Sequence, residues 1–192
     1  MKSRASGGEE ETAWTTRSRA VAYRGHTTLV NHTVELEDGT ELNYEVDESV
    51  PFAVAVLVVD GDDVILSRQY RYPLGRWIHD LPGGGGREGE TPIAAALREV
   101  EEELGVIPLE LQPLHTFSMN PGRSAWPVHL FVSTSGVRPA VADRSNRAEQ
   151  VRLERMTISD LDALIARGEI VDPALLVARA MAAASGVLPP LG

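Results

Sequence analysis

The chain has 192 residues, of which 43% are hydrophobic, so it is long enough for one domain with a small appendage and too apolar for global disorder. It carries 28 acidic against 18 basic residues, and the formal net charge of −10 excludes a general affinity for nucleic acid or for anionic membranes. The absence of cysteine excludes disulfides and thiolate chemistry.

The first residues, up to about residue 16, are predicted to form a flexible tail. They mix glycine, serine, glutamate and threonine without periodicity and contain no apolar run that resembles a signal peptide. The longest apolar run of the chain, residues 52–59, is far shorter than the roughly 20 residues that span a bilayer. We therefore expect a cytoplasmic protein that makes no use of a membrane.

Residues 17–48 are predicted to form a small N-terminal β region. Its clearest strands are residues 33–36 and 41–44, and the Asp38-Gly39 turn between them is typical of a β-hairpin.

After this region, the valine-rich run of residues 52–59 predicts a strand that is buried on both faces. Further strands are predicted at residues 64–70, 129–134 and 151–156. Strands interspersed with helices indicate an α+β fold or a mixed α/β sandwich.

A helix is predicted between Thr91, as N-cap, and Gly105, with Pro92 at its first position. Its apolar stripe is expected to consist of five residues at helical spacing: Ile93, Ala96, Leu97, Val100 and Leu104. Two later helices are predicted, one from about Ser159, as N-cap, to Gly168 and the other from Asp172-Pro173 to near Gly186.

The first of these helices carries three glutamates, Glu99, Glu102 and Glu103, on the side turned away from its apolar stripe. Like charges at this spacing weaken an isolated helix by roughly 0.2–0.5 kcal/mol per pair. They indicate either a solvated helix face or a site for Mg²⁺ or Mn²⁺, which prefer oxygen ligands. The glycine run of residues 83–86, directly before the helix, favours the cation site because it lets the backbone approach a ligand closely.

These residues resemble a known signature. Gly84, Glu90 and the segment from Arg98 to Val106 match the Nudix box at each of its defining positions. The resemblance implies a Nudix hydrolase domain over residues 49–188, an α/β/α sandwich whose mixed sheet is flanked by helices. It also implies cleavage of a nucleoside diphosphate linked to another moiety.

The same resemblance implies roles for the residues of the box. Glu99, Glu102, Glu103 and the carbonyl of Gly83 would be the ligands of Mg²⁺, with Mn²⁺ as the alternative cation. Glu102 and Glu103 would thereby be catalytic. Glu90 and Arg98 would be a structural pair that holds the loop against the helix.

Beyond the box, the segment Ser67 to Arg71 and the later Pro121 resemble the ADP-ribose pyrophosphatase branch of the family. Arg71 is therefore a candidate substrate contact, and its alternative is a surface arginine that closes a strand. Pro121 and Arg123 lie in a turn that could face the substrate. Tyr44 could stack on a nucleobase, since aromatic faces suit bases.

In this branch the general base is a glutamate in a loop after the box, just before a strand. Glu149 stands at the matching position, with a solvated loop carboxylate as the alternative interpretation and Glu154 as a substitute base. The sequence departs from the family pattern at Asp80, where a glutamate is usual, and at Asn43-Tyr44, where the branch often has an arginine that holds the base.

We thus expect metal-dependent hydrolysis of ADP-ribose or a related nucleoside diphosphate sugar, giving AMP or another nucleoside monophosphate and a sugar phosphate. The alternatives are a hydrolase of GDP-mannose-type or other nucleoside diphosphates and a Nudix-type sensor that binds a nucleotide without hydrolysing it. The expected partners are a small nucleotide substrate and a second copy of the chain, in a homodimer formed through residues 17–48.

Overall fold

The computed structural model describes residues 14–140 and 151–191. The chain divides into two compact units. The first contains the residues up to Ser49 together with Gly122–Ala125, and the second contains Val50–Pro121 and the chain from Trp126 onward. The candidate base Glu149 lies outside the described residues.

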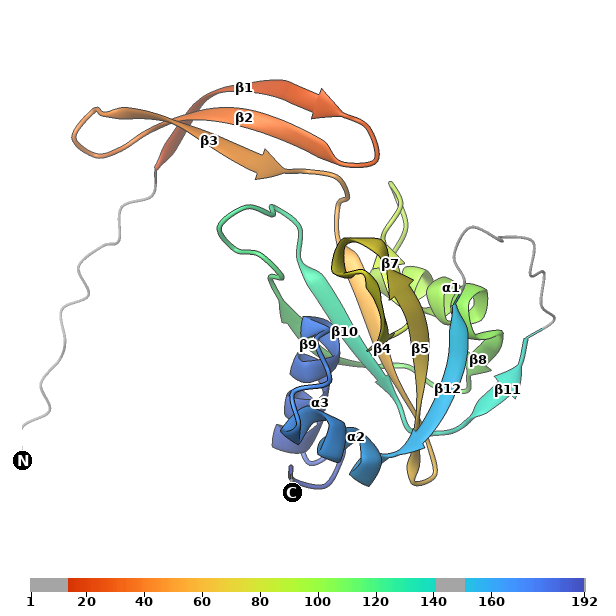
Figure 1. The fold of residues 1–192 in the computed structure, drawn as a ribbon. Helices are drawn as coiled ribbons and strands as arrows, with labels where there is room; N and C mark the ends of the chain where they lie inside the picture. The colour runs from red at the N-terminus through yellow and green to blue at the C-terminus, as the bar shows by residue number, and fades with distance from the viewer. Residues whose placement is uncertain (1–13, 141–150, 192) are drawn as a thin grey trace, which may run out of the picture. The chain divides into compact units, whose positions relative to one another are not determined.

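The first unit is a three-stranded antiparallel sheet (Figure 1). Its strands, in spatial order, are β1 (Thr15–Arg24), β2 (Thr28–Glu35) and β3 (Glu41–Asp47). The predicted turn at Asp38-Gly39 connects β2 to β3, with Gly39 at a φ of 81°, a left-handed conformation that favours glycine. Strand β1 begins at Thr15, inside the segment that we expected to be tail.

The segment Gly122–Ala125 joins the first unit through backbone hydrogen bonds to the end of β3. The N–H of Asp47 donates to the carbonyl of Arg123 at 2.7 Å, and the N–H of Ala125 donates to the carbonyl of Asp47 at 3.1 Å. This pairing explains why four residues from late in the chain belong to the N-terminal unit.

The second unit is built on a seven-stranded mixed sheet (Figure 1). Its main path runs in the order β12-β5-β4-β10-β9, with β6 added to β5 and β7 added to β4. Only the β4–β10 pair is parallel. The strands are β4 (Ala53–Asp60), β5 (Asp63–Arg71), β6 (Arg76–Asp80), β7 (Gly83–Gly85), β9 (Gln112–Phe117), β10 (Val128–Ser133) and β12 (Arg152–Thr157).

Among the described residues of this unit there are also three helices, a 3₁₀ turn, η1 (Tyr72–Leu74), and a separate two-stranded sheet of β8 (Val106–Pro108) and β11 (Val137–Pro139). The helices are α1 (Pro92–Leu104), α2 (Ile158–Ala166) and α3 (Pro173–Ala184). Figure 1 shows α1 on one side of the sheet and α2 and α3 on the other.

Strand β4 explains why helices cover both faces. Alternate residues of a strand point to opposite sides, and every one of its apolar side chains is buried or nearly so. Its even-numbered valines, Val54, Val56 and Val58, pack in one core with α1. Ala55, Leu57 and Val59 pack in the other core with α2 and α3. The expected α+β sandwich is thus confirmed.

Helix α1 has the predicted ends. The hydroxyl of Thr91 accepts a hydrogen bond from the N–H of Ala94 at 3.3 Å, and Gly105 ends the helix with a φ of 67°. The predicted stripe was wrong at Ile93, which is 44% exposed, while Ala95 is buried in the core. Ile93 lies in the first helical turn, before the helix reaches the sheet's apolar face.

The N-cap of α2 is Thr157, and the prediction of Ser159 was wrong. The hydroxyl of Thr157 accepts from the N–H of Asp160 at 3.0 Å and donates to the Asp160 carboxylate at 2.7 Å. Thr157 thus satisfies both a backbone donor and a first-turn acidic side chain, which Ser159 from inside the helix cannot do.

The alanine-rich helix α3 contains a buried charge that the sequence analysis missed. Arg179 is 1% exposed, and its guanidinium makes two hydrogen bonds of 2.7 Å to the Asp162 carboxylate. It also donates to the carbonyls of Pro189 and Pro190 at 3.0 and 3.4 Å. This side chain therefore ties α2, α3 and the C-terminal residues together.

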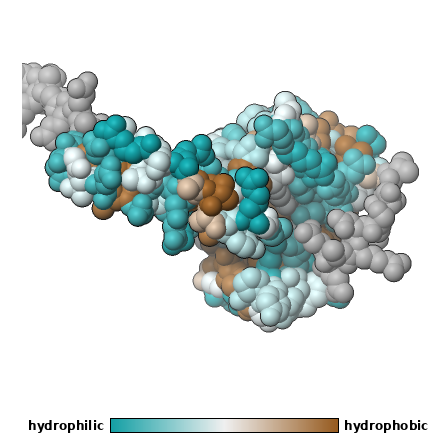
Figure 2. Space-filling model, turned by 90° about the horizontal axis from the view of Figure 1, so that it is seen from above, coloured by the Kyte–Doolittle hydropathy of each residue, from teal (hydrophilic) through white to brown (hydrophobic). Residues whose placement is uncertain are grey.

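Within the described residues, none of the helices is both long enough and apolar enough to cross a membrane. Figure 2 shows hydrophilic residues over most of the visible surface of each unit, with hydrophobic residues in small separate patches.

Candidate active site

Two glycines allow strand β7 to lie directly against β4 and under α1. A Cβ on Gly83 would lie 2.3 Å from the carbonyl oxygen of Val54, and a Cβ on Gly84 would lie 2.6 Å from Oε1 of Glu99. Any side chain at either position would displace one of these neighbours. The glycine run therefore brings a stretch of backbone into contact with the first glutamate of the helix.

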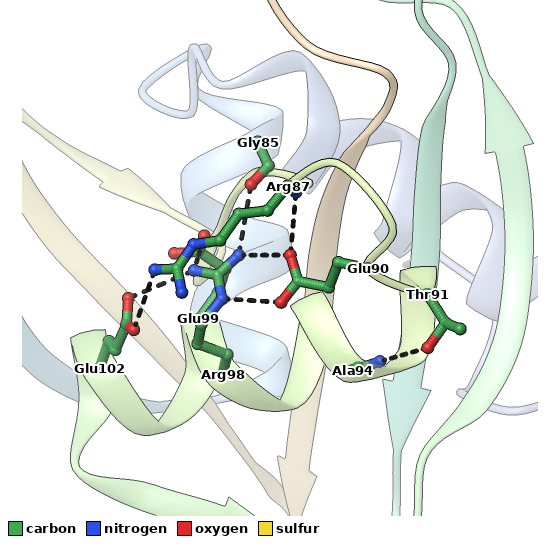
Figure 3. A network of polar contacts seen from close by, with 8 residues as sticks. All are labelled: Gly85, Arg87, Glu90, Thr91, Ala94, Arg98, Glu99 and Glu102. Atoms are coloured by element: carbon green, nitrogen blue, oxygen red, sulfur yellow. Dashed lines mark hydrogen bonds and ion pairs between the residues drawn. The ribbon is translucent and has the colours of Figure 1, made fainter.

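Arg98 is the centre of the polar network between this loop and α1 (Figure 3). Its guanidinium donates two hydrogen bonds, of 2.9 and 3.0 Å, to the Glu90 carboxylate and a third, of 3.3 Å, to the carbonyl of Gly85. The same group contacts Glu99 at 2.6 Å and Glu102 at 3.3 Å. Arg98 thus connects the loop to two of the three clustered glutamates.

The charges of this network stabilise one another. Hydrogen bonds from Arg98 and from the N–H of Arg87 lower the pKa of Glu90 to about 2. Hydrogen bonds to Glu90 and Glu99 outweigh the effect of burial and raise the pKa of Arg98. Glu90 and Arg98 are therefore both charged throughout the physiological range.

The residues at this site fit a divalent cation. Carboxylate oxygens and a backbone carbonyl are hard ligands of the kind that Mg²⁺ and Mn²⁺ prefer, and the missing Cβ of Gly84 lets the Glu99 carboxylate lie directly against the backbone. Across residues 14–140 and 151–191 no three acidic or histidine side chains gather around one point, and Arg98 contacts Glu99 and Glu102. The ligand set of Glu99, Glu102, Glu103 and Gly83 stays a prediction.

Glu103 faces strand β5 of the sheet. The amide of Gln69 donates to its carboxylate at 3.5 Å, and its negative charge acts on the guanidinium of Arg71. Arg71, a candidate substrate contact by the family resemblance, therefore lies on the same side of the sheet as Glu103. Gln69 is 6% exposed and was not singled out by the sequence analysis.

Arg71 has a charged partner that the sequence did not reveal. Its Nε donates to Oδ2 of Asp80 at 3.1 Å, and its Nη2 makes a second hydrogen bond to the same oxygen. Burial opposes the charge of Arg71, but the bonds to Asp80 outweigh this effect and raise its pKa. By the family resemblance a glutamate is expected at the position of Asp80. Although the aspartate side chain is one methylene shorter, it still reaches Arg71.

A second carboxyl group, that of Asp172, lies against Asp80. Asp172 is the N-cap of α3, where its Oδ2 accepts from the N–H of Leu175 at 2.6 Å. Burial and the neighbouring charge of Asp80 raise the pKa of Asp172 to about 7. From the sequence, Asp172 was predicted only as the start of a helix, because no sequence motif connects it with Asp80 on β6.

The substitute base Glu154 has two charged or titratable neighbours. On β12 its carboxylate lies 3.0 Å from Nε2 of His79 and 3.8 Å from Arg68. The predicted base Glu149 belongs to residues 141–150, which the structure does not describe.

The other predicted substrate contacts are Tyr44, Arg123 and Pro121. Tyr44 and Arg123 belong to the first unit, where the Tyr44 hydroxyl donates to the carbonyl of Gly122 at 2.8 Å and Arg123 lies 3.7 Å from Glu45. Tyr44 also meets Trp14 edge to face, with ring centroids 6.2 Å apart. Pro121 is exposed at the end of the second unit's chain segment.

Comparisons with known proteins identify the family of this chain. The family model described as "NUDIX domain" matches residues 50–176. An ADP-ribose pyrophosphatase of Bacillus subtilis (strain 168) is 34% identical over 140 residues, which cover 72% of this chain and 75% of that protein. A methanol dehydrogenase activator of Bacillus methanolicus is 31% identical over 146 residues, which cover 76% of this chain and 78% of that protein.

A solved structure supports the fold in the same way. The crystal structure described as an ADP compounds hydrolase matches with a TM-score of 0.73 and 21% sequence identity. The match covers 94% of this chain and 100% of the other. At this identity the likeness shows the fold alone.

Proposed function

The chain belongs to the NUDIX family and is a pyrophosphatase of nucleoside diphosphate compounds, and we propose that its substrate is ADP-ribose or a related nucleoside diphosphate sugar. The products would be AMP, or another nucleoside monophosphate, and a sugar phosphate. The observation that carries the proposal is the complete Nudix box, with Glu99, Glu102 and Glu103 on α1 beside the glycine strand β7. The activity of the similar Bacillus subtilis protein supports the choice of ADP-ribose.

Glu99, Glu102, Glu103 and the carbonyl of Gly83 would hold Mg²⁺, or Mn²⁺ as the alternative. When bound, such a cation polarises the diphosphate and makes a bound water more acidic. The described structure supports this assignment through the Glu99 carboxylate, which lies against the Gly84 backbone, and through the pairing of Arg98 with Glu90, which anchors the helix to the loop.

The chain's other residues would bind and orient the substrate. Arg71 would bind a diphosphate oxygen, because a guanidinium offers paired donors to phosphate. Tyr44 would stack on the nucleobase. Pro121 and Arg123 would contact the substrate from the turn in which they both lie. Glu149 would accept the proton of the attacking water, which requires it to come within hydrogen-bond reach.

The test is a comparison of wild type with Glu103→Gln on a panel of nucleoside diphosphate sugars, with Mg²⁺ or Mn²⁺ added. We expect hydrolysis of ADP-ribose and a loss of about a hundredfold or more in kcat in the variant. Glu101→Gln is the matched control, because Glu101 is an exposed neighbour on the same helix. Unchanged turnover of the whole panel by Glu103→Gln would refute the proposed site.

The same panel separates the alternatives. Preference for GDP-mannose or another nucleotide conjugate would change the substrate assignment and leave the site intact. Binding of ADP-ribose by the wild type without release of AMP would instead identify a nucleotide sensor.

We further propose that the first unit forms the interface of a homodimer. Apolar side chains on its strands are exposed, with Val21 at 52%, Tyr23 at 57% and Leu42 at 41%. Exposed apolar side chains of this kind can take part in an association surface. Sedimentation velocity of the wild type and of Val21→Lys tests this, and a monomeric wild type would refute it.

A further inference from the structure

A chain of charged groups leads from Glu103 on α1 to the N-terminus of α3. Asp80, at the end of β6, is 6% exposed and is a hydrogen-bond partner of Arg71. Arg71 in turn faces the negative charge of Glu103 on α1. A buried carboxylate needs such a partner, because leaving it unpaired costs several kcal/mol.

Asp172 adds a second carboxyl group behind the first. It is held in place by the N–H groups of Leu175 and Ala174 at the start of α3, and its side chain hydrogen-bonds to Asp80. Two carboxylates in contact cannot both ionise easily, so one of them retains a proton. Burial favours the protonated form of Asp172, so we assign the shared proton to this residue.

We propose that Asp172 is a positioning residue for Arg71 and acts through Asp80. Its protonated carboxyl donates a hydrogen bond to one oxygen of Asp80, so that the other oxygen orients the guanidinium toward the diphosphate of the substrate. The inference rests on the proposed function, in which Arg71 binds that diphosphate.

Loss of the Asp172 proton changes this balance. The groups that face Asp172 are Asp80 from β6, Arg71 from β5 and the N–H groups of α3, while Glu103 from α1 faces Arg71. After deprotonation, two adjacent carboxylates compete with the substrate for one guanidinium. An additional negative charge also lies near an anionic diphosphate, so the affinity for the substrate decreases.

The test measures binding of a non-hydrolysable methylene analogue of ADP-ribose to the full chain by calorimetry with Mg²⁺ present. If substrate binding changes the pKa of Asp172 by about one unit, we expect the analogue to bind about tenfold more weakly at about pH 8.5 than at about pH 5.5. Asp172→Asn keeps both a hydrogen-bond donor to Asp80 and a good N-cap but cannot lose a proton. We expect it to bind at the tight, low-pH level throughout.

Asp160→Asn is the matched control. Asp160 is likewise an acidic residue at the start of a helix, in the first turn of α2, and its carboxylate accepts a hydrogen bond from the hydroxyl of Thr157. We expect it to follow the wild-type profile. Asp172→Asn with the pH dependence of the wild type, or a wild type that binds equally at all pH values, would overturn the inference.

Carbon-13 NMR of aspartate carboxyl groups gives a second, activity-independent measurement. The Asp172 resonance, assigned from its loss in Asp172→Asn, should titrate near neutral pH, and its midpoint should rise in Arg71→Gln because a positive charge is removed. A midpoint in the ordinary acidic range would also overturn the inference.

These measurements distinguish the two proposals. If wild type and Asp172→Asn show the expected binding profiles but the wild type does not hydrolyse ADP-ribose, the proposed function is refuted and the role of Asp172 remains supported. Hydrolysis together with identical profiles for wild type and Asp172→Asn would refute only the inference. No binding of the analogue by the wild type would refute both.

Discussion

Glu90 lies just before α1 and Arg98 lies two turns into it, and hydrogen bonds of 2.9 and 3.0 Å join the two side chains end to end. Their side chains are only 15% and 17% exposed. Because Arg98 also contacts Glu99 and Glu102, this pair sets the position of the proposed metal ligands. Outer residues of this kind orient the ligands that they contact.

Glu90→Gln should therefore reduce activity, although the Glu90 side chain is not proposed to contact the substrate. The amide keeps the shape of the side chain but loses the charge that holds Arg98. We expect kcat/KM for ADP-ribose to decrease by about 10–100-fold and the melting temperature to decrease. Glu88→Gln, an exposed position on the same loop, is the control, and an equal loss in that variant would contradict the prediction.

The same pair predicts a dependence of stability on acid. The pKa of Glu90 is lowered from 4.5 to about 2, so its contribution to stability is present above about pH 4.5 and is lost as the pH decreases through about 2. The difference in melting temperature between wild type and Glu90→Gln should thus be largest near neutral pH and should disappear at the lowest pH. A constant difference from about pH 7 to about pH 2 would disprove this assignment.

Two alanine substitutions in the glycine run should act differently. In Gly84→Ala the new Cβ meets the end of the Glu99 side chain, which can move, so activity should decrease while stability changes little. In Gly86→Ala the Cβ would lie 2.2 Å from the Phe52 ring, and this overpacking should cost about 1–3 kcal/mol. Urea denaturation and kcat of both variants check the contrast, and equal effects on stability would contradict it.

Asp172 predicts the opposite pH dependence from Glu90. Its pKa is raised from 3.8 to about 7, so its contribution to stability is full below about pH 3.8 and is lost as the pH rises through about 7. The melting temperature of the wild type should decrease relative to Asp172→Asn between about pH 5 and about pH 8. Parallel curves for the two proteins over this range would show that Asp172 titrates normally.

The ion pair of Arg179 and Asp162 should be one of the largest single contributors to stability. Asp162→Ala leaves a charge that is 1% exposed without its carboxylate and should cost about 3–5 kcal/mol in the free energy of unfolding. Adding Arg179→Met should recover much of this loss, because an apolar replacement of a buried pair is often neutral. Chemical denaturation measures both, and a double variant no more stable than Asp162→Ala would contradict the explanation.

Much of the fold and the site followed from the sequence where the signals are local. The ends of α1 at Thr91 and Gly105 and the hairpin at Asp38-Gly39 depend on a few consecutive residues, and the structure confirms them. The cap of α2 was misplaced because Thr157 and Ser159 have similar propensities, and only the contact with Asp160 distinguishes them. Glu149 remains a prediction, since it lies outside the described residues.

The residues of the Nudix box are close in sequence, and helical spacing alone put Glu99, Glu102 and Glu103 on one side of α1. The partners of Arg71 could not be found in this way. Asp80 reaches Arg71 through the pairing of β5 with β6, and Asp172 reaches Asp80 from the start of α3, far along the chain. Spacing along one element determines which side chains share a face, whereas contacts between elements, and the pKa shifts that result, arise only when the chain packs.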